Sequence, residues 1–339
     1  MPNRSPLRLI ALVLALVLLT PLLFACSSAK PIEGTEEELA VIGTCADTDV
    51  LYEELRLVTL TYRAMLAQQY GDDIWSDPTK AEAHRRELEE LVYGNLTANY
   101  AVLSLCNEYD ISYEDKEITE AVQKQVEDTV KQLGGMNAYK SFLEENNLTD
   151  HLLRFSYAVS LCENQLYLTM TQDPSLIDTS DESIRDFLHS NAVIRTLHVF
   201  VSQDSGESVA DNRAKAEKAL DAIKNDGLAF NTAIGRYSED YHMTTTDGYY
   251  FSRGEMIEPY EEAAFALAVD EVSDIVETEL GFFIIKRLPK DEAYMTAHFE
   301  ALKTQCAAAM FNQIVSARQA ELSVALNEYG AGLDLTKIS

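Results

Sequence analysis

The spacing of apolar residues predicts that the first half of the chain is helical. Between residues 51 and 172, apolar residues recur at positions i, i+3, i+4 and i+7, which places them on one face of a helix. The breaks between the helical segments contain the glycine, proline, asparagine and aspartate residues that end helices. Residues 39–50, just before, predict a short strand and a turn that leads into the first helix.

The pattern changes to that of a sheet between residues 194 and 288. This stretch opens with IRTLHVFV, a strand-like run, and continues with an amphipathic helix that Gly227 closes. It ends with SDIVETELGFFIIKRL, which has the pattern of a β-hairpin. Because these last strands are too close in sequence for a helical crossover, we predict a compact α+β module with an antiparallel sheet.

The chain after Pro289 returns to a helical pattern. Residues 293–329 predict one long helix with an apolar stripe formed by Leu302, Cys306, Met310, Ile314 and Ala317. A single amphipathic helix cannot bury its stripe alone, so we expect it to pack on the N-terminal helices. The central module is then an insertion within one helical domain. The expected boundaries are 1–25, 26–38, 39–190, 191–289 and 290–339.

The first 25 residues have the pattern of a secretory signal peptide. Arg4 and Arg8 precede an uncharged apolar run, and Leu23-Phe24-Ala25-Cys26 follows it. The cysteine at the cleavage point resembles a bacterial lipobox, although Phe24 is bulkier than the usual residue. We therefore expect Cys26 to be lipidated and residues 26–38 to form a tether. The alternatives are an uncleaved membrane anchor and a secreted protein with an incidental cysteine.

The charge of the chain argues against a nucleic-acid partner. There are 56 acidic and 27 basic residues, a formal net charge of −29, and phosphate contacts need clustered Lys and Arg. This charge suits a solvated, soluble surface, and a preference for basic clients is the alternative.

The remaining cysteines show no CxxC spacing, so no zinc or thioredoxin-like site is expected, and nothing else in the sequence indicates a metal or a cofactor. We expect Cys45, Cys106, Cys162 and Cys306 to be free buried thiols, with three disulfide pairings as the alternative.

Four blocks of the central module carry a family resemblance. They are the opening strand with His198, the segment Phe230 to Asp240, the segment Phe251 to Leu267, and the closing Glu271 to Lys286. In this order and spacing they resemble a parvulin-type peptidyl-prolyl isomerase domain, which implies a four-stranded antiparallel sheet flanked by helices. With a lipid-anchored start and helices on both sides, the chain is similar to the PrsA/SurA class of extracytoplasmic foldases.

The resemblance implies a site for rotation about X–Pro bonds. That reaction breaks no bond, so it needs an apolar pocket for the proline ring and a few hydrogen-bonding groups near the rotating carbonyl. The implied catalytic positions are His198, Asp240, Ser238 and Thr278. The implied substrate-binding positions are Met256, Tyr260, Phe251 and Phe283. On residue type alone, the apolar side chains among these are core residues, and a histidine on a strand is a structural one.

Three departures from the family pattern leave a second hypothesis open. Phe283 stands where the family carries a second histidine, and Ile257 follows Met256 where glutamine is common. After Gly248 the pocket's leucine is missing or replaced by a tyrosine. The leading hypothesis is a foldase at the extracytoplasmic face of the cell membrane, anchored through Cys26. It would act on unfolded or partly folded exported polypeptides that contain X–Pro bonds. The alternative is a non-catalytic holdase with a degenerate module.

Overall fold

The computed structural model describes residues 30–339 except 72, 204–205, 207 and 244–246. The predicted signal peptide and Cys26 lie outside the described residues. The described chain divides into two compact units. One, the helical unit, contains the residues up to Thr169 together with Ile314–Ser339, and the other, the sheet unit, is Met170–Gln313.

The helical unit contains the helices expected between residues 51 and 172. They are α2 (Tyr52–Tyr70), α3 (Pro78–Glu108), α4 (Lys116–Leu133), α5 (Met136–Glu145) and α6 (Asp150–Gln172), whose last turn enters the sheet unit. Two of these helices begin at a residue whose side chain caps the first turn. The Asp77 carboxylate accepts from the first-turn N–H groups of α3, and the Thr149 hydroxyl accepts from Leu152 N at 2.9 Å.

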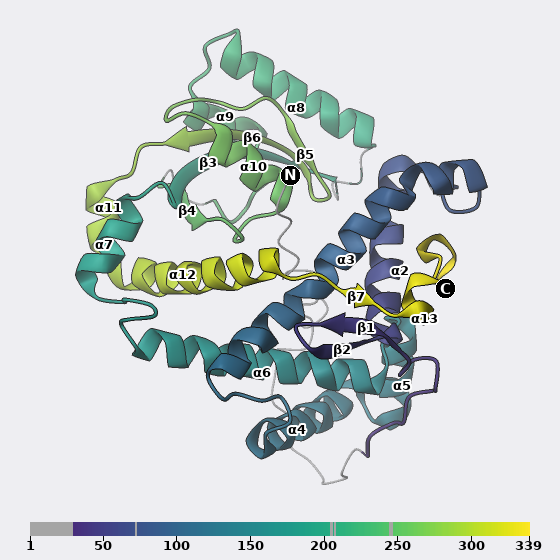
Figure 1. Cartoon of the computed structure of the whole chain (residues 1–339). Helices are drawn as coiled ribbons and strands as arrows, with labels where there is room; N and C mark the ends of the chain where they lie inside the picture. The colour runs from purple at the N-terminus through teal and green to yellow at the C-terminus, as the bar shows by residue number, and fades with distance from the viewer. Residues whose placement is uncertain (1–29, 72, 204–205, 207, 244–246) are drawn as a thin grey trace. The chain divides into compact units, whose positions relative to one another are not determined.

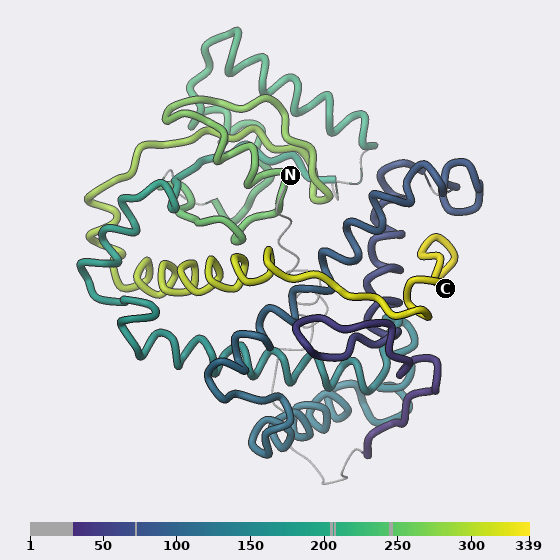
Figure 2. The backbone as a smooth tube through the Cα atoms, viewed as in Figure 1, coloured from purple at the N-terminus to yellow at the C-terminus, as the bar shows by residue number. Residues whose placement is uncertain are grey.

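A small sheet joins the two ends of the helical unit in space. Strands β1 (Val41–Cys45), β2 (Thr48–Leu51) and β7 (Ala325–Leu326) pair in the order β2-β1-β7, with both pairings antiparallel. Figure 2 shows β7, near the C-terminal end of the trace, beside the first described strands. Residues 39–50 therefore contain parts of two strands, where the sequence predicted one.

The prediction of a single helix over residues 293–329 is wrong. The chain forms α11 (Glu292–Ala297) and α12 (Phe299–Glu321), then β7, then the short α13 (Glu328–Ala331) and the 3₁₀ turn η2 (Leu335–Lys337). Apolar residues after Glu321 fall at every second position, at Leu322, Val324 and Leu326, which suits a strand. The start of α13 is capped by Asn327, whose side chain accepts from Gly330 N.

The stripe predicted on this segment divides between two environments. Leu302 and Cys306 are buried with Ile184, Leu188 and Tyr250 in the sheet unit. In the helical unit, Arg318 donates to Ser104 and Glu108, and Ala317 is exposed. The prediction for the cysteines is confirmed, since Cys45, Cys106, Cys162 and Cys306 are free and buried.

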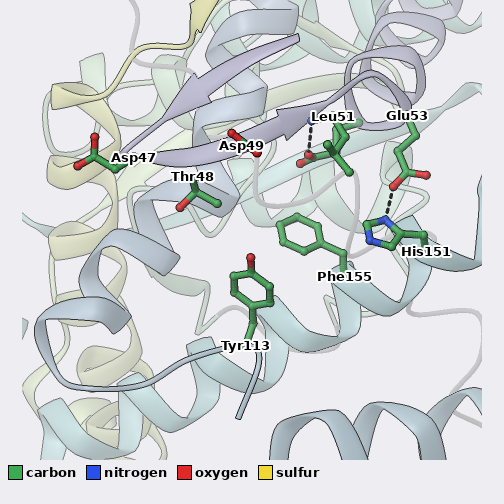
Figure 3. A pocket seen from close by; sticks show the side chains of 9 residues that line it. Asp47, Thr48, Asp49, Leu51, Glu53, Tyr113, His151 and Phe155 are labelled. Carbon is green, nitrogen blue, oxygen red and sulfur yellow. Dashed lines mark hydrogen bonds and ion pairs between the residues drawn. The ribbon is translucent and has the colours of Figure 1, made fainter. Parts of the chain in front are cut away.

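Buried carboxylates tie the β1–β2 hairpin to the surrounding helices. Glu54 lies in the first turn of α2 and accepts from Leu51 N at 3.0 Å and from the Tyr100 hydroxyl at 2.8 Å. Its neighbour Glu53 accepts from Thr149 and bonds to the ring of His151, as Figure 3 shows for the histidine. Glu53, Glu54 and His151 are among the residues that line a cavity of about 430 Å³. Burial raises the pKa of Glu54 to about 7.

The sheet unit carries the α+β fold expected from the sequence. Its elements are α7 (Asp181–His189), β3 (Val193–Ser202), α8 (Val209–Lys224), α9 (Phe230–Tyr237), β4 (Tyr249–Ser252), α10 (Glu258–Ala266), β5 (Val276–Thr278) and β6 (Gly281–Leu288), followed by α11 and most of α12. The strands form one four-stranded sheet in the order β4-β3-β6-β5, with every pairing antiparallel. The fold prediction is confirmed.

Strand β3 lies within the four-stranded sheet (Figure 1), and the alternation of side chains along a strand gives this sheet two faces. Leu197 and Val199 pack on one face with residues of α8 and α9, and Ile194 packs on the other with residues of α10. Strand β6 pairs with β3 from Arg195 to Ser202 and begins at Gly281. At Gly281 φ is +143°, and a Cβ atom would meet the Val201 carbonyl oxygen at 2.1 Å, so the turn requires glycine.

The raised pKa of Glu54 gives a testable pH dependence of stability. The folded-state pKa of Glu54 lies above the ordinary value of 4.5. The protonated carboxyl therefore makes its full contribution to the free energy of unfolding below pH 4.5, and this contribution is lost as the pH rises through about 7. We expect Glu54→Gln, which mimics the protonated form, to be more stable than the wild type at pH 8 by roughly 3 kcal/mol. At pH 4.5 the difference should be near zero. Urea unfolding followed by circular dichroism measures both.

The exposed Glu114→Gln variant controls for the loss of one negative charge. A Glu54→Gln difference that is the same at both pH values would contradict the assignment.

Candidate functional site

A polar group lies on the face of the sheet that α10 covers. Thr196 and His198 are two residues apart on β3, so their side chains point to this same face. Tyr260 on α10 lies against both of them. All three are buried, among apolar neighbours such as Ile194 and Phe251. Buried polar groups are costly unless they are hydrogen-bonded, so their partners define the site.

The first partner of His198 is Asp240. The Nε2 atom of His198 lies 3.0 Å from Asp240 Oδ2, and the two side chains are 10% and 13% exposed. The segment after α9 holds Asp240 in place through the backbone of β3. Ser238 Oγ accepts from Phe200 N, and Glu239 N donates to the Phe200 carbonyl at 2.7 Å.

Two further donors converge on the Asp240 carboxylate. His242 N donates to Oδ1 at 2.8 Å, and the Tyr249 hydroxyl donates to Oδ2 at 3.0 Å. Partial burial raises the pKa of Asp240, but the bonds from His242, Tyr249 and His198 outweigh it and hold the pKa below its ordinary value of 3.8. The group is therefore an anion at neutral pH. In turn, burial and the bond to Asp240 raise the pKa of Tyr249 to about 12.

The second partner of His198 is the Tyr260 hydroxyl. It lies 3.1 Å from Nδ1 of the ring and 2.8 Å from Thr196 Oγ1. Burial lowers the pKa of His198 below its ordinary value of 6.5, and the nearby Asp240 opposes this effect only in part. The imidazole is therefore neutral at pH 7. A continuous chain of hydrogen bonds runs from Thr196 through Tyr260 and His198 to Asp240.

Aromatic rings enclose the imidazole of His198. Tyr249 stacks over it with ring centroids 5.6 Å apart, and Phe283 meets it edge-on at 5.2 Å. Phe200 stacks in turn on Phe283 at 4.5 Å. Phe283, which stands where the family carries a second histidine, therefore places an apolar ring beside His198 in place of a polar one.

The other predicted site residues, all of which the structure describes, make no hydrogen bond to the His198 ring. Ser238 binds backbone N–H groups, among them that of Phe200. Thr278 is the last residue of β5, where its hydroxyl donates to the Gly281 carbonyl at 2.9 Å. Phe251 is 1% exposed within the core under α10, and Met256 packs against that core while staying partly exposed. Of the predicted set, His198, Asp240, Tyr260 and Phe283 come together directly.

A cavity of about 590 Å³ opens beside Asp240. Its lining residues are Phe200, Ser202, Lys215, Glu239, Asp240, Tyr241 and His242. The predicted proline-binding residues do not line this cavity. Tyr241 is 90% exposed at its edge. The cavity therefore brings solvent, and any bound chain segment, to the Asp240 end of the hydrogen-bond chain.

Sequence reasoning missed two members of the group. Thr196 occupies the second position before His198, and period-two alternation along the strand was the signal that could have placed it on the same face. Tyr249 was noted only as a replacement for an apolar pocket residue. Its hydroxyl bond to Asp240 follows from β4 pairing with β3 opposite Thr196, a register that the sequence does not state.

Two kinds of feature are absent from the described residues. Outside the gaps in the description, no three His, Cys, Asp or Glu side chains are grouped so as to hold a metal ion. In the same part of the chain, no helix combines the length and the apolarity that crossing a membrane requires.

Comparisons with known proteins concern the domain that contains this group. Residues 198–288 match the family described as rotamase, PPIC-type PPIase domain. The foldase protein PrsA of Staphylococcus epidermidis is 28% identical over 182 residues, which cover 51% of this chain and 53% of that protein. The chain thus spans about half the length of that relative. The foldase protein PrsA of Caldanaerobacter subterraneus is 24% identical over 82% of both chains.

Among solved structures, the crystal structure of PrsA from Bacillus subtilis aligns with 84% of this chain and 91% of its own, at 19% identity and a TM-score of 0.28. The residues matched by the family lie in the sheet unit. This chain contains a rotamase domain of the PPIC, or parvulin, type and resembles the PrsA foldases.

Proposed function

We propose that this protein is an extracytoplasmic foldase whose rotamase domain binds X–Pro segments of exported polypeptides and accelerates their cis–trans isomerisation. The observation that carries the proposal is the hydrogen-bonded pair of His198 and Asp240 at the edge of a cavity. An anionic carboxylate and a neutral imidazole are held there, largely shielded from water, by hydrogen bonds from neutral groups. The family match supports the same reaction.

The reaction requires stabilisation of a twisted amide. The barrier to rotation is about 18–20 kcal/mol, most of it from lost resonance, and X–Pro bonds isomerise spontaneously over tens of seconds or more. An enzyme accelerates the rotation by binding the twisted state more tightly than either planar state. In the twisted state the nitrogen regains its lone pair and the carbonyl oxygen loses negative charge. The anionic Asp240 near that carbonyl would favour this shift of charge.

The hydrophobic contacts of the site would hold the proline ring. Met256, the partly exposed member of the predicted pocket, packs against the core formed by Phe251, Tyr260 and Phe283. An apolar ring gains roughly 25 cal/mol for each Å² of its surface removed from water. In this proposal the apolar side chains supply binding, and the groups around Asp240 act on the rotating bond.

A non-catalytic holdase is the second candidate function. The observation that favours it is Phe283, whose ring fills the space beside His198 with apolar atoms. Polar atoms near the rotating bond would then be fewer, while affinity for apolar segments would be retained. The helical unit would in that case do the work of preventing aggregation.

An isomerisation assay separates the two candidates. With residues 27–339 and a proline tetrapeptide, in a protease-free format, we expect acceleration that Asp240→Ala lowers by roughly 10-fold or more, the scale of one charged hydrogen-bonding group. Met256→Ala should weaken substrate binding and raise KM. Glu217→Ala on α8, an exposed carboxylate paired with Arg213, is the matched control and should keep full activity.

Failure of the wild type to accelerate the reaction, together with suppressed aggregation of an unfolded client, would decide for the holdase.

The pH dependence of activity follows from the protonation states in the site. Because the pKa of His198 is lowered from 6.5, the neutral ring persists below that pH. Because the pKa of Asp240 is also lowered, the carboxylate stays anionic over the same range. We expect a flat profile of kcat/KM from about pH 8 to 6.5 and a decline only at lower pH, measured while circular dichroism confirms an intact fold. A decline centred above pH 6.5 would contradict a buried neutral His198.

Anchoring through Cys26 is part of the proposal. The lipobox-like sequence ending at Cys26 supports it, and attachment of more than one acyl chain would give stable membrane binding. We expect the wild-type protein in the membrane fraction of a bacterial host, with a mature N-terminus at an acylated Cys26 by mass spectrometry. Cys26→Ser should abolish acylation. Recovery of unacylated wild-type protein from the soluble fraction would exclude the anchor.

A further inference from the structure

The imidazole of His198 depends on different partners at its two nitrogens. Nε2 faces the carboxylate of Asp240 at 3.0 Å, and Nδ1 faces the hydroxyl of Tyr260 at 3.1 Å. The residue is 8% exposed, so the protein rather than water must satisfy both atoms. A neutral imidazole carries one proton, and which nitrogen holds it is set by these partners.

The partners determine the direction of every bond in the chain. An ionised carboxylate can only accept, so Nε2 of His198 must carry the proton and donate to Asp240. In the neutral ring Nδ1 is then an acceptor, and the Tyr260 hydroxyl must donate to it. The oxygen of Tyr260 remains free to accept, and the Thr196 hydroxyl lies 2.8 Å away to donate.

The surroundings leave Tyr260 as the donor to Nδ1. The Phe283 ring that meets the imidazole edge-on has no polar atom, and the Tyr249 ring that stacks on it directs its hydroxyl to Asp240. Tyr260 is itself 2% exposed and Thr196 is 0% exposed, so water does not compete for their bond. Among the described residues, these contacts give the tyrosine hydroxyl one acceptor, His198, and one donor, Thr196.

We propose that Tyr260, oriented by Thr196, is a positioning residue that holds His198 in its Nε2-protonated, neutral form and keeps the ring directed at Asp240. This role rests on the proposed isomerase function, and it names the residue that fixes the orientation of His198 in that site. It also assigns the Tyr260 hydroxyl a task separate from the apolar contacts of its ring. In this arrangement the polar function that Phe283 cannot supply comes from α10.

The consequence for Asp240 explains why the tautomer matters. With the proton on Nε2, the imidazole donates to the carboxylate and helps to keep it anionic and fixed. With the proton on Nδ1, the lone pair of Nε2 would face the carboxylate, and the two groups would repel each other. Loss of the Tyr260 hydroxyl removes the donor that selects the first form. The ring is then free to take the wrong tautomer or to rotate away.

The test uses the full chain in detergent, labelled with ¹⁵N at histidine. Long-range ¹H–¹⁵N spectra report which ring nitrogen carries the proton, and assignment comes from His198→Gln. We expect the wild-type ring to be neutral and Nε2-protonated at pH 7. In Tyr260→Phe we expect a mixture of tautomers and a fall in kcat of roughly 10-fold with little change in KM, because one buried hydrogen bond is lost and the aromatic ring remains.

Two further variants keep the test decisive. Thr196→Val preserves shape and removes only the hydroxyl that orients Tyr260, so it should give a smaller change of the same kind, and it carries the test if Tyr260→Phe does not fold. Tyr250→Phe is the matched control. Its hydroxyl accepts from Asp291 N outside this network, and its loss should leave the His198 spectrum and the activity unchanged.

The spectra and the kinetics fail separately. If the wild type shows no isomerase activity but Tyr260→Phe still shifts the tautomer, the proposed function is lost and the positioning role stands. The proposal is overturned if His198 stays Nε2-protonated and neutral, with unchanged kcat, in both Tyr260→Phe and Thr196→Val. It is also overturned if the wild-type ring is protonated at both nitrogens at pH 7, because Tyr260 would then accept rather than donate.

Discussion

The rotamase domain depends on one constraint, the burial of β3 on both faces. Leu197 and Val199 pack in the core under α8 and α9, while Ile194 and Phe200 pack in the core under α10. Between these last two, the same face carries Thr196 and His198. Because the strand alternates strictly, the two polar residues cannot reach water by turning to the other side. Their hydrogen bonds must therefore be made within the protein, and this requirement organises the elements around them.

Three of the segments around β3 meet that requirement. Helix α10 brings the Tyr260 hydroxyl to both polar residues, the segment after α9 brings Asp240, and β4 brings Tyr249. The site is thus assembled from separate elements that are far apart in sequence but adjacent in the sheet and its cover. A shift of β4 by one residue would turn Tyr249 to the opposite face and remove one of the donors to Asp240.

The sequence allowed prediction of what local patterns encode. Helical periodicity between residues 51 and 172 and the strand at IRTLHVFV correspond to α2 to α6 and to β3. Prediction from the sequence failed where two paired strands lie far apart along the chain. The strand β7 pairs with β1, about 280 positions earlier in the chain, whereas the local pattern predicts the end of a helix there. The site behaves likewise. His198 was identifiable by its block and Thr196 by alternation along the same strand, but the bond from Tyr249 to Asp240 depends on the sheet register.

The energetic cost of the network bears on which function the domain serves. Placing a carboxylate and an imidazole in a mostly buried site costs desolvation energy, and apolar residues of similar volume often give equal or greater stability. The network is therefore a poor means of holding β3, α9 and α10 together, since the core around it already does so. A spacer or a purely hydrophobic binding module would have no use for an anion at the edge of a cavity. Perturbed, partly buried titratable groups gather at functional sites for this physical reason. The arrangement around Asp240 therefore supports the proposed isomerase over the alternative of a module that only retains apolar segments.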